Sequence, residues 1–228
     1  DTEAFEVSMK SQKTMARESG KFNTTKTLPY EGTNTEFLGY IDTYSSSKIL
    51  AMFKDSNEVN ELKEGDKAIL ILDKSPFYAE SGGQVGDSGC IKTKDAKFYV
   101  QDTIKIKKTV FGHIGVLETG SLKCNEEVEA SIDEHRRDDI KRNHSVTHLL
   151  HKALKIVLGD HVEQKGSLVD NLKTRFDFSH TKPISNDEIH QIESIVNNEI
   201  LTNKVTTTEM MSIDKAKESG ALMLFGEK

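Results

Sequence analysis

Along the first half of the chain, apolar residues occur in short alternating or continuous runs, a pattern that predicts β-strands. Such runs occupy residues 36–44, 47–54, 68–72, 97–106 and 111–117. Turn-forming residues separate them, as at Gly65 and Gly120. We therefore predict a compact, barrel-like β structure for residues 23–130, preceded by a charged helix at residues 1–22.

From about Asp133 onward, the apolar residues recur at helical spacing instead. Residues 144–151 read HSVTHLLH. At about 100° per residue, both His148 and His151 lie within roughly 40° of His144 around a helix. The apolar residues of this helix cluster on the opposite side: Val146, Leu149, Leu150, Ala153, Leu154 and Val157. We expect one face to pack and the other to carry imidazoles, with none of the three histidines in the core.

The remaining residues predict further strands and helices. In residues 175–180, Arg175, Asp177 and Ser179 alternate with Phe176, Phe178 and His180, which is typical of a half-buried strand. Ser185 and Glu188 form the pattern of a capping box, which predicts a helix that ends near residue 201. The residues that we expect on its buried stripe are Ile189, Ile192, Val196 and Ile200.

After this helix, residues 205–211 are strand-like, and residues 212–219 predict a short helix closed by Gly220. The fold class is therefore α+β: a β-barrel-like subdomain followed, at residues 131–228, by helices packed on an antiparallel sheet.

Histidines at positions i and i+4 of a helix can hold one zinc ion between them, which makes His144 and His148 candidate metal ligands. Ser145 stands where a zinc protease has its general-base glutamate, so protease chemistry is excluded. Two histidines are only half of a tetrahedral site. Cys90 and Cys124 lack a C-x-x-C arrangement and are interpreted as reduced thiols. The position of His151 on the helix would allow it to be a third ligand, but we interpret it as a surface residue. The alternative is that the histidines simply form a solvated polar face of the helix.

Composition limits the class of protein. Two cysteines in 228 residues argue against a disulfide scaffold, and no apolar run approaches the ~20 residues of a membrane span. We therefore expect a cytoplasmic protein without a membrane partner. Because the net charge is −6, contact with nucleic acid would have to use local basic patches. The candidates are Arg136, Arg137, Lys141 and Arg142, or Lys105, Lys107 and Lys108.

A glycine-rich segment at residues 76–89 reads PFYAESGGQVGDSG. It lacks the Gly-Lys-Ser/Thr of a nucleotide P-loop, and its glycine spacing does not match G-x-G-x-x-G. By itself the segment indicates tight turns between strands.

Taken together, the glycine-rich segment, the histidine helix, and residues 161–169 (HVEQKGSLV) and 172–180 (LKTRFDFSH) resemble the editing region of the alanine–tRNA ligase (alanyl-tRNA synthetase) family. The opening FEVSMKSQK at residues 5–13 resembles the segment that joins the aminoacylation half of that enzyme to its editing domain. The resemblance covers nearly the whole chain in the order of the family. It implies a connecting helix at residues 1–22 and an editing subdomain at residues 131–228.

The resemblance also implies a site. His144 and His148 would bind zinc together with a Cys-x-x-x-His motif that this chain lacks, so we expect a piece that ends before that motif. Gln164 would be the catalytic pocket residue that hydrogen-bonds the substrate. Residues of the glycine-rich segment would line the substrate pocket: Gly82, Gly83, Gln84 and Asp87. For Arg175 we favour an ion pair with Asp177 over contact with RNA phosphate.

The implied reaction is hydrolysis of the ester in seryl- or glycyl-tRNA(Ala), within an enzyme that ligates alanine to tRNA(Ala) using ATP. Glycine and serine differ too little from alanine for one binding site to reject both, and a second hydrolytic site solves that problem. ATP and magnesium would belong to the absent aminoacylation domain. The expected partners are the tRNA(Ala) acceptor end and the other domains of the parent chain, with no DNA.

Two alternatives stay open. One is a non-catalytic module that positions tRNA or holds structural zinc. The other is a free-standing aminoacyl-tRNA hydrolase acting in trans, against which the predicted connecting helix argues.

Overall fold

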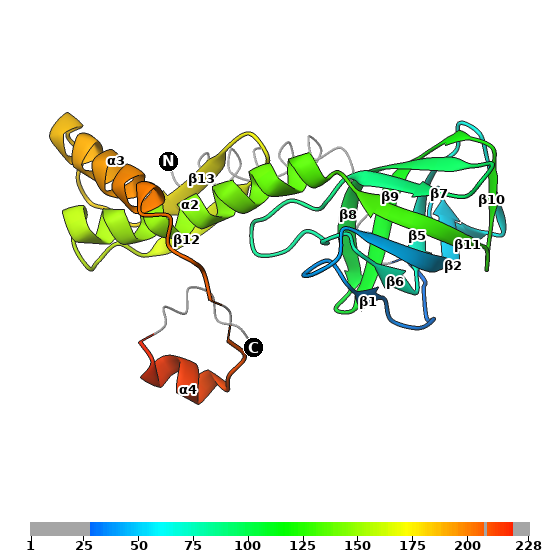
Figure 1. Ribbon diagram of the computed structural model, residues 1–228, viewed down its shortest axis with the longest axis horizontal. Coiled ribbons are helices and arrows are strands. Elements are labelled where there is room, and N and C mark those ends of the chain that lie inside the picture. Colours follow the sequence, from blue (N-terminus) through cyan, green and yellow to red (C-terminus); the bar gives the residue numbers. More distant parts are fainter. Residues whose placement is uncertain (1–27, 208, 221–228) are drawn as a thin grey trace, which may run out of the picture. The chain divides into compact units, whose positions relative to one another are not determined.

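The computed structural model describes residues 28–207 and 209–220, and Figure 1 shows the arrangement of their helices and strands. The helix predicted at residues 1–22 lies outside the described residues. The described chain folds as two compact units. The first comprises residues 28–80 and 86–133, and the second comprises residues 81–85 together with the chain from residue 134 onward.

The first unit consists of β-strands. These strands are β1 (Glu36–Phe37), β2 (Tyr44–Lys54), β3 (Asn57–Val59), β4 (Glu61–Lys63), β5 (Lys67–Leu72), β6 (Lys74–Ser75), β7 (Gly89–Lys92), β8 (Lys97–Lys107), β9 (Val110–Thr119), β10 (Ser121–Lys123) and β11 (Glu127–Ile132). The strand order is β11-β7-β8-β9-β5-β2, and β11 also pairs with β2. Within the described residues, six antiparallel strands therefore close into a barrel, which confirms the barrel-like prediction.

The closing strand β11 was not among the predicted strands, although its side chains alternate. Val128, Ala130 and Ile132 are buried, and the residues between them are exposed or half-buried. Glutamates at positions 127 and 129 disfavour a strand by local propensity. Pairing on both edges of β11 outweighs that weak preference.

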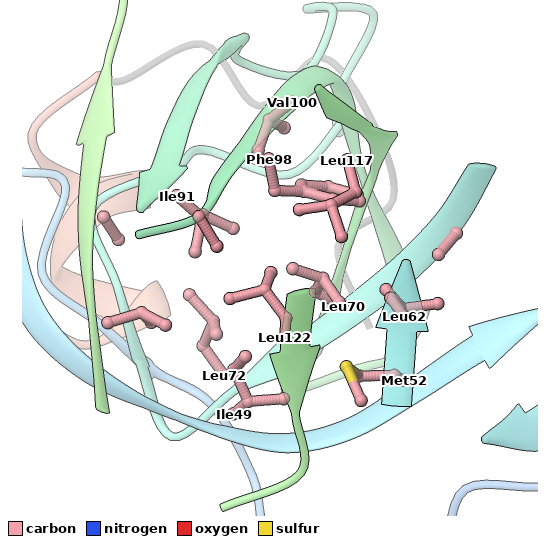
Figure 2. Close-up of a cluster of buried hydrophobic side chains, with 14 of the residues drawn as sticks. Ile49, Met52, Leu62, Leu70, Leu72, Ile91, Phe98, Val100, Leu117 and Leu122 are labelled. Carbon is pink, nitrogen blue, oxygen red and sulfur yellow. The ribbon is translucent and has the colours of Figure 1, made fainter. Parts of the chain in front are cut away.

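The barrel interior holds the larger hydrophobic core. Figure 2 shows its side chains meeting inside the curved sheet, among them Ile49, Met52, Leu62, Leu70, Leu72, Ile91, Phe98, Val100, Leu117 and Leu122. A second cluster, which includes Ile69 and Ile71 of β5, packs with Leu28 and Tyr30. Strand β5 is thus buried on both faces, which explains why its apolar run is continuous rather than alternating.

The strand predicted at residues 36–44 is wrong over most of its length. Glu36–Phe37 forms a short strand parallel to β6, and Tyr44 begins β2, but the chain turns between them, with Ile41 N–H donating to Leu38 O at 3.1 Å. A side chain at Gly39 would collide with the carbonyl oxygen of Pro76, so this close backbone approach requires glycine. The apolar pattern that suggested a strand includes Tyr40 and Ile41, which are exposed.

The second unit contains α2 (Glu134–Leu158), β12 (Gln164–Val169), β13 (Thr174–Phe178), α3 (Asn186–Leu201) and α4 (Ile213–Glu218). Strands β12 and β13 form an antiparallel hairpin, and α2 contacts both this hairpin and α3 (Figure 1). The predicted α+β class is therefore confirmed. Among the described residues, no helix combines the length and the apolar character needed to cross a membrane.

Helix α3 begins at the predicted residue, but it buries fewer of its apolar residues than we predicted. Ser185 Oγ accepts from the Glu188 N–H, and the Glu188 carboxylate accepts from the Ser185 N–H, so the capping box is confirmed. The helix buries Ile192 and packs Ile195 and Val196 against the core. Two residues expected on the stripe, Ile189 and Ile200, are exposed, because only the middle of the helix faces the core.

The strand predicted at residues 205–211 is also wrong for the residues that the structure describes there. Residues 205–207 and 209–211 have no strand conformation, and Val205 and Met210 are exposed. An alternating pattern makes a strand only when another strand supplies hydrogen bonds and a buried face. The short helix α4 follows as predicted, and Gly220 after it has φ of 77°.

Candidate functional site

The glycine-rich segment joins the second unit through residues 81–85, which lie alongside β12. Val169 N–H donates to Gly83 O at 2.8 Å, and Val85 N–H donates to Val169 O at 3.0 Å. Ser81 and Gln84 close a tight turn through hydrogen bonds between their backbone groups. The predicted tight turn is thus present, and it is attached to the end of strand β12.

The two central glycines of this turn have different neighbours. Gly82 and Gly83 have φ of 61° and 84°, in the left-handed region that favours glycine. A Cβ at Gly83 would collide with the Ser167 hydroxyl and stand 2.6 Å from the Ser167 carbonyl oxygen. A Cβ at Gly82 would have no neighbour within 4 Å. Gly83 is therefore required by packing as well as by conformation, whereas Gly82 leaves open space beside the turn.

A hydrogen bond brings the turn and the histidine helix together. Since a carbonyl oxygen only accepts, His144 Nδ1–H donates to Gln84 Oε1, at 2.6 Å, and the Gln84 side chain is only 7% exposed. The neutral imidazole of His144 then carries its lone pair on Nε2. This arrangement, in which a protein carbonyl orients one ring nitrogen and leaves the other free to accept, is typical of histidine metal ligands.

His144 and His148 lie together on α2 as predicted. Their rings are stacked, with centroids 5.2 Å apart and an interplanar angle of 20°. Burial lowers the pKa of His144, and the nearby His148 lowers it further. The neutral form of His144, which is the form that can bind a metal ion, is therefore favoured.

The donor set fits part of a zinc site. His144 and His148 are both imidazoles on one helix face, and His144 has an oriented ring, which suits zinc. In the part of the chain that the structure describes, no third histidine, cysteine or carboxylate joins them. The described residues thus supply two of the four ligands of a closed tetrahedral site.

His151 is not the surface residue that the helical pattern predicted. It is 3% exposed, and its ring packs against Phe176 with centroids 5.1 Å apart. Its Nε2 has no hydrogen-bond partner among the described residues, and burial lowers the pKa of the ring. The prediction failed because the hairpin covers a side of α2 that the apolar pattern had left open to solvent.

Two polar residues of α2 that the sequence reasoning missed attach the helix to the hairpin. Asn143 Nδ2 donates to Asp170 O at 2.8 Å, and the hydroxyls of Thr147 and Thr174 lie 2.6 Å apart. Asn143, Thr147 and His151 are spaced four residues apart, so they share one helix face. That spacing was visible in the sequence, but polar residues beside histidines suggested a solvated face.

The structure places Gln164 away from the His144–Gln84 contact, at the other end of β12. Gln164 begins β12 and pairs with Phe178 next to a β-bulge, whereas Gln84 pairs with Val169 at the other end of the strand. Five residues of strand separate these ends by roughly 16 Å. Asp87 belongs to the first unit, where its carboxylate accepts from the Tyr78 N–H at 2.7 Å.

Three basic residues of the second unit lie close to carboxylates. Arg175 pairs with Asp177 at 3.2 Å, as we favoured from the sequence. On α2, Arg142 pairs with Asp139, and Lys141 lies 3.9 Å from Asp138. Exposed pairs of this kind add little to stability, and their cations are balanced locally.

Comparison with known proteins identifies the class to which this chain belongs. Residues 1–136, more than half of the chain, match the family model described as tRNA synthetases class II (A). The chain therefore belongs to the class II tRNA synthetase family.

Individual relatives of this chain give a more specific assignment than the family model. Over 228 residues, the whole of this chain, it is 51% identical to an alanine–tRNA ligase of Delftia acidovorans, 53% identical to one of Methylobacillus flagellatus and 52% identical to one of Thiobacillus denitrificans. The chain spans 26% of the length of each of these proteins. The resemblance to alanine–tRNA ligase that the motifs suggested is thereby confirmed.

Proposed function

We propose that this chain is the editing part of an alanine–tRNA ligase and that its second unit hydrolyses wrongly charged tRNA(Ala). The observation that carries the proposal is the 2.6 Å hydrogen bond between His144 and Gln84. It joins the two motifs that the family resemblance assigns to one pocket, the glycine-rich turn and the histidine helix. The parent enzyme would ligate alanine to tRNA(Ala) with ATP and magnesium in a separate domain, in the cytoplasm.

The proposed substrates are seryl- and glycyl-tRNA(Ala), because a site built for alanine discriminates weakly against both. Serine is larger than alanine, so size alone cannot protect the correct product. The pocket must therefore bind the serine hydroxyl by a hydrogen bond, or position the attacking water only when the wrong substrate is bound. The open space at Gly82 would admit the small aminoacyl group beside the backbone, and the amide donor of Gln84 would bind its polar atoms. Gln164, at the other end of β12, would act on another part of the bound aminoacyl-tRNA.

His144 and His148 would hold a zinc ion, together with the cysteine and histidine of the family motif. When bound, zinc would supply Lewis acidity and a template that orients the ester or a water molecule. The role of Gln84 in this proposal is to orient His144 by accepting a hydrogen bond from its Nδ1–H, so that Nε2 remains available. Asp87 stays a predicted substrate-binding residue whose carboxylate is engaged within the first unit.

The proposal is tested by serine release from seryl-tRNA(Ala), with zinc supplied, using this chain and a longer chain that includes the Cys-x-x-x-His motif. We expect release above the uncatalysed rate from the longer chain, and a loss of roughly tenfold or more in its His144→Ala variant. His135→Ala, which removes an exposed histidine from the same helix, is the matched control and should be neutral. If His144→Ala leaves zinc content and rate unchanged, the metal assignment is wrong.

Gln164 separates an editing enzyme from a binding module. In the longer chain, Gln164→Ala should reduce deacylation while leaving tRNA affinity nearly unchanged. A non-catalytic module would release no serine in any variant, and an editing site that does not use Gln164 would keep its full rate in Gln164→Ala.

A further inference from the structure

A second pair of histidines lies at the open end of the hairpin. His161 precedes β12, and His180 follows β13. His161 Nε2 and His180 Nδ1 are 2.9 Å apart, and the ring centroids are separated by 5.2 Å with an interplanar angle of 21°. The two nitrogens therefore face each other directly and share one proton as a hydrogen bond.

Backbone contacts hold the two histidines at this spacing without help from their rings. Ser179 N–H donates to Glu163 O at 3.0 Å, and Glu163 N–H donates to Ser179 Oγ at 3.1 Å. The same hydroxyl donates to His161 O at 3.0 Å. The two segments that carry the imidazoles are thus hydrogen-bonded to each other beside the pair, so the two nitrogens are preorganised.

The surroundings suit a cation and allow the rings to adjust. Gly159 has no side chain, and a Cβ there would stand 3.1 Å from His161 Nδ1, so glycine leaves room for this ring to turn. The Glu188 carboxylate has a lowered pKa, mainly through hydrogen bonds from Ser185 and partly through the charge of nearby His180. Glu188 therefore places negative charge within electrostatic reach of the pair.

We propose that His161 and His180 form a binding site for a divalent transition-metal ion of the class that prefers imidazole: copper, nickel or zinc. Two imidazoles on a tetrahedral zinc ion have nitrogens roughly 3.3 Å apart, given Zn–N distances of ~2.0 Å. To reach that geometry, the facing nitrogens need to move apart by about 0.4 Å, and the rings need to turn so that both lone pairs point at the ion. The shared proton moves to the other nitrogen of its ring, so that both facing nitrogens present lone pairs to the ion.

This site is distinct from the His144–His148 pair. His144 contacts Gln84, which pairs with the Val169 end of β12, whereas His161 precedes the Gln164 end. The strand separates these ends by roughly 16 Å. The described residues offer no third histidine, cysteine or carboxylate at either pair. Water would complete the coordination of the second site, and affinity should follow the order Cu²⁺ above Ni²⁺ and Zn²⁺.

The test uses this chain with His144→Ala and His148→Ala, so that the first pair cannot bind metal. Copper(II) titration followed by calorimetry and by electron paramagnetic resonance should give one ion per chain with two nitrogen ligands. Adding His161→Gln or His180→Gln should weaken binding roughly tenfold or more. Adding His190→Ala, an exposed histidine on α3, should leave it unchanged.

A direct measurement keeps the test valid if a substitution disturbs folding. In the same double variant, with both hairpin histidines intact, paramagnetic copper should broaden the ring proton resonances of His161 and His180 first. Equal broadening of all exposed histidines, or copper affinity unaffected by His161→Gln and His180→Gln in folded protein, would overturn the proposal.

Discussion

His144 and Gln84 are sixty positions apart in the sequence and joined by a 2.6 Å hydrogen bond between ring Nδ1 and the side-chain oxygen. This contact fixes the tautomer of His144 and connects helix α2 to the glycine-rich turn. Because Gln84 is buried and His144 is half-buried, solvent cannot readily replace the lost partner if either is changed.

Replacing Gln84 should therefore release the His144 ring. In Gln84→Leu, the acceptor is gone, and we expect His144 to populate both neutral tautomers rather than the Nδ1–H form alone. Gln84→Glu retains acceptor oxygens and is the matched control. Nitrogen NMR of the histidine rings reads the tautomer directly, and an unchanged Nδ1–H form in Gln84→Leu would show that other contacts orient the ring.

The two glycines of the turn should respond differently to alanine. Gly83→Ala combines a left-handed backbone with collision against Ser167, and should destabilise the second unit by roughly 2–4 kcal/mol. Gly82→Ala has the backbone cost but open space, and should lose only about 1–2 kcal/mol. Urea unfolding followed by circular dichroism compares them. Equal losses would mean that the contact with Ser167 relaxes freely.

The barrel should lose stability in acid because of His113. Its ring is fully buried, with Nδ1 2.9 Å from Leu70 O and Nε2 2.7 Å from Ser75 Oγ, and burial lowers its pKa from 6.5 to about 4. The folded protein binds this proton less tightly than the unfolded chain. The contribution of the neutral His113 ring to the free energy of unfolding is therefore complete above pH 6.5. This contribution is lost as the pH falls towards 4, a change of about 3 kcal/mol.

Urea unfolding of the barrel between pH 7.5 and pH 4 measures this dependence. His113→Gln removes the titrating group, so its stability should be lower at neutral pH and should vary less over this interval. If the stability of His113→Gln varies with pH as much as that of the unsubstituted chain, other groups cause the acid sensitivity.

The hydroxyls of Thr147 and Thr174 should couple α2 to the hairpin. They lie 2.6 Å apart in a partly buried position, and Thr147 Oγ1 also lies 2.9 Å from Asn143 O. Thr147→Val and Thr174→Val keep the shape of the side chain and remove the hydroxyl. A double-mutant cycle in unfolding free energy should give a coupling of about 0.5–1.5 kcal/mol. If the losses of unfolding free energy in the two single variants add up to the loss in the double variant, the two hydroxyls have no net interaction.

Much of this architecture follows from patterns between near neighbours in the chain. The capping box at Ser185 and the alternation in β13 were predicted, because each depends on residues within a turn or two of itself. The helix that carries His144 and His148 was found in the same way. Local hydrogen bonding and side-chain periodicity decide such features, and both can be read from the order of residues.

The features that failed or were missed depend on partners distant in the sequence. Residues 205–211 alternate like a strand but find no strand to pair with among the described residues, whereas β11 becomes a strand because β2 and β7 flank it. His151 is buried because the hairpin covers its side of α2, which no helical wheel can show. The motifs identified the family and its candidate ligands. The contact of His144 with Gln84 and the facing nitrogens of His161 and His180 arose from long-range packing, since burial and hydrogen bonding between separate segments depend on the whole fold.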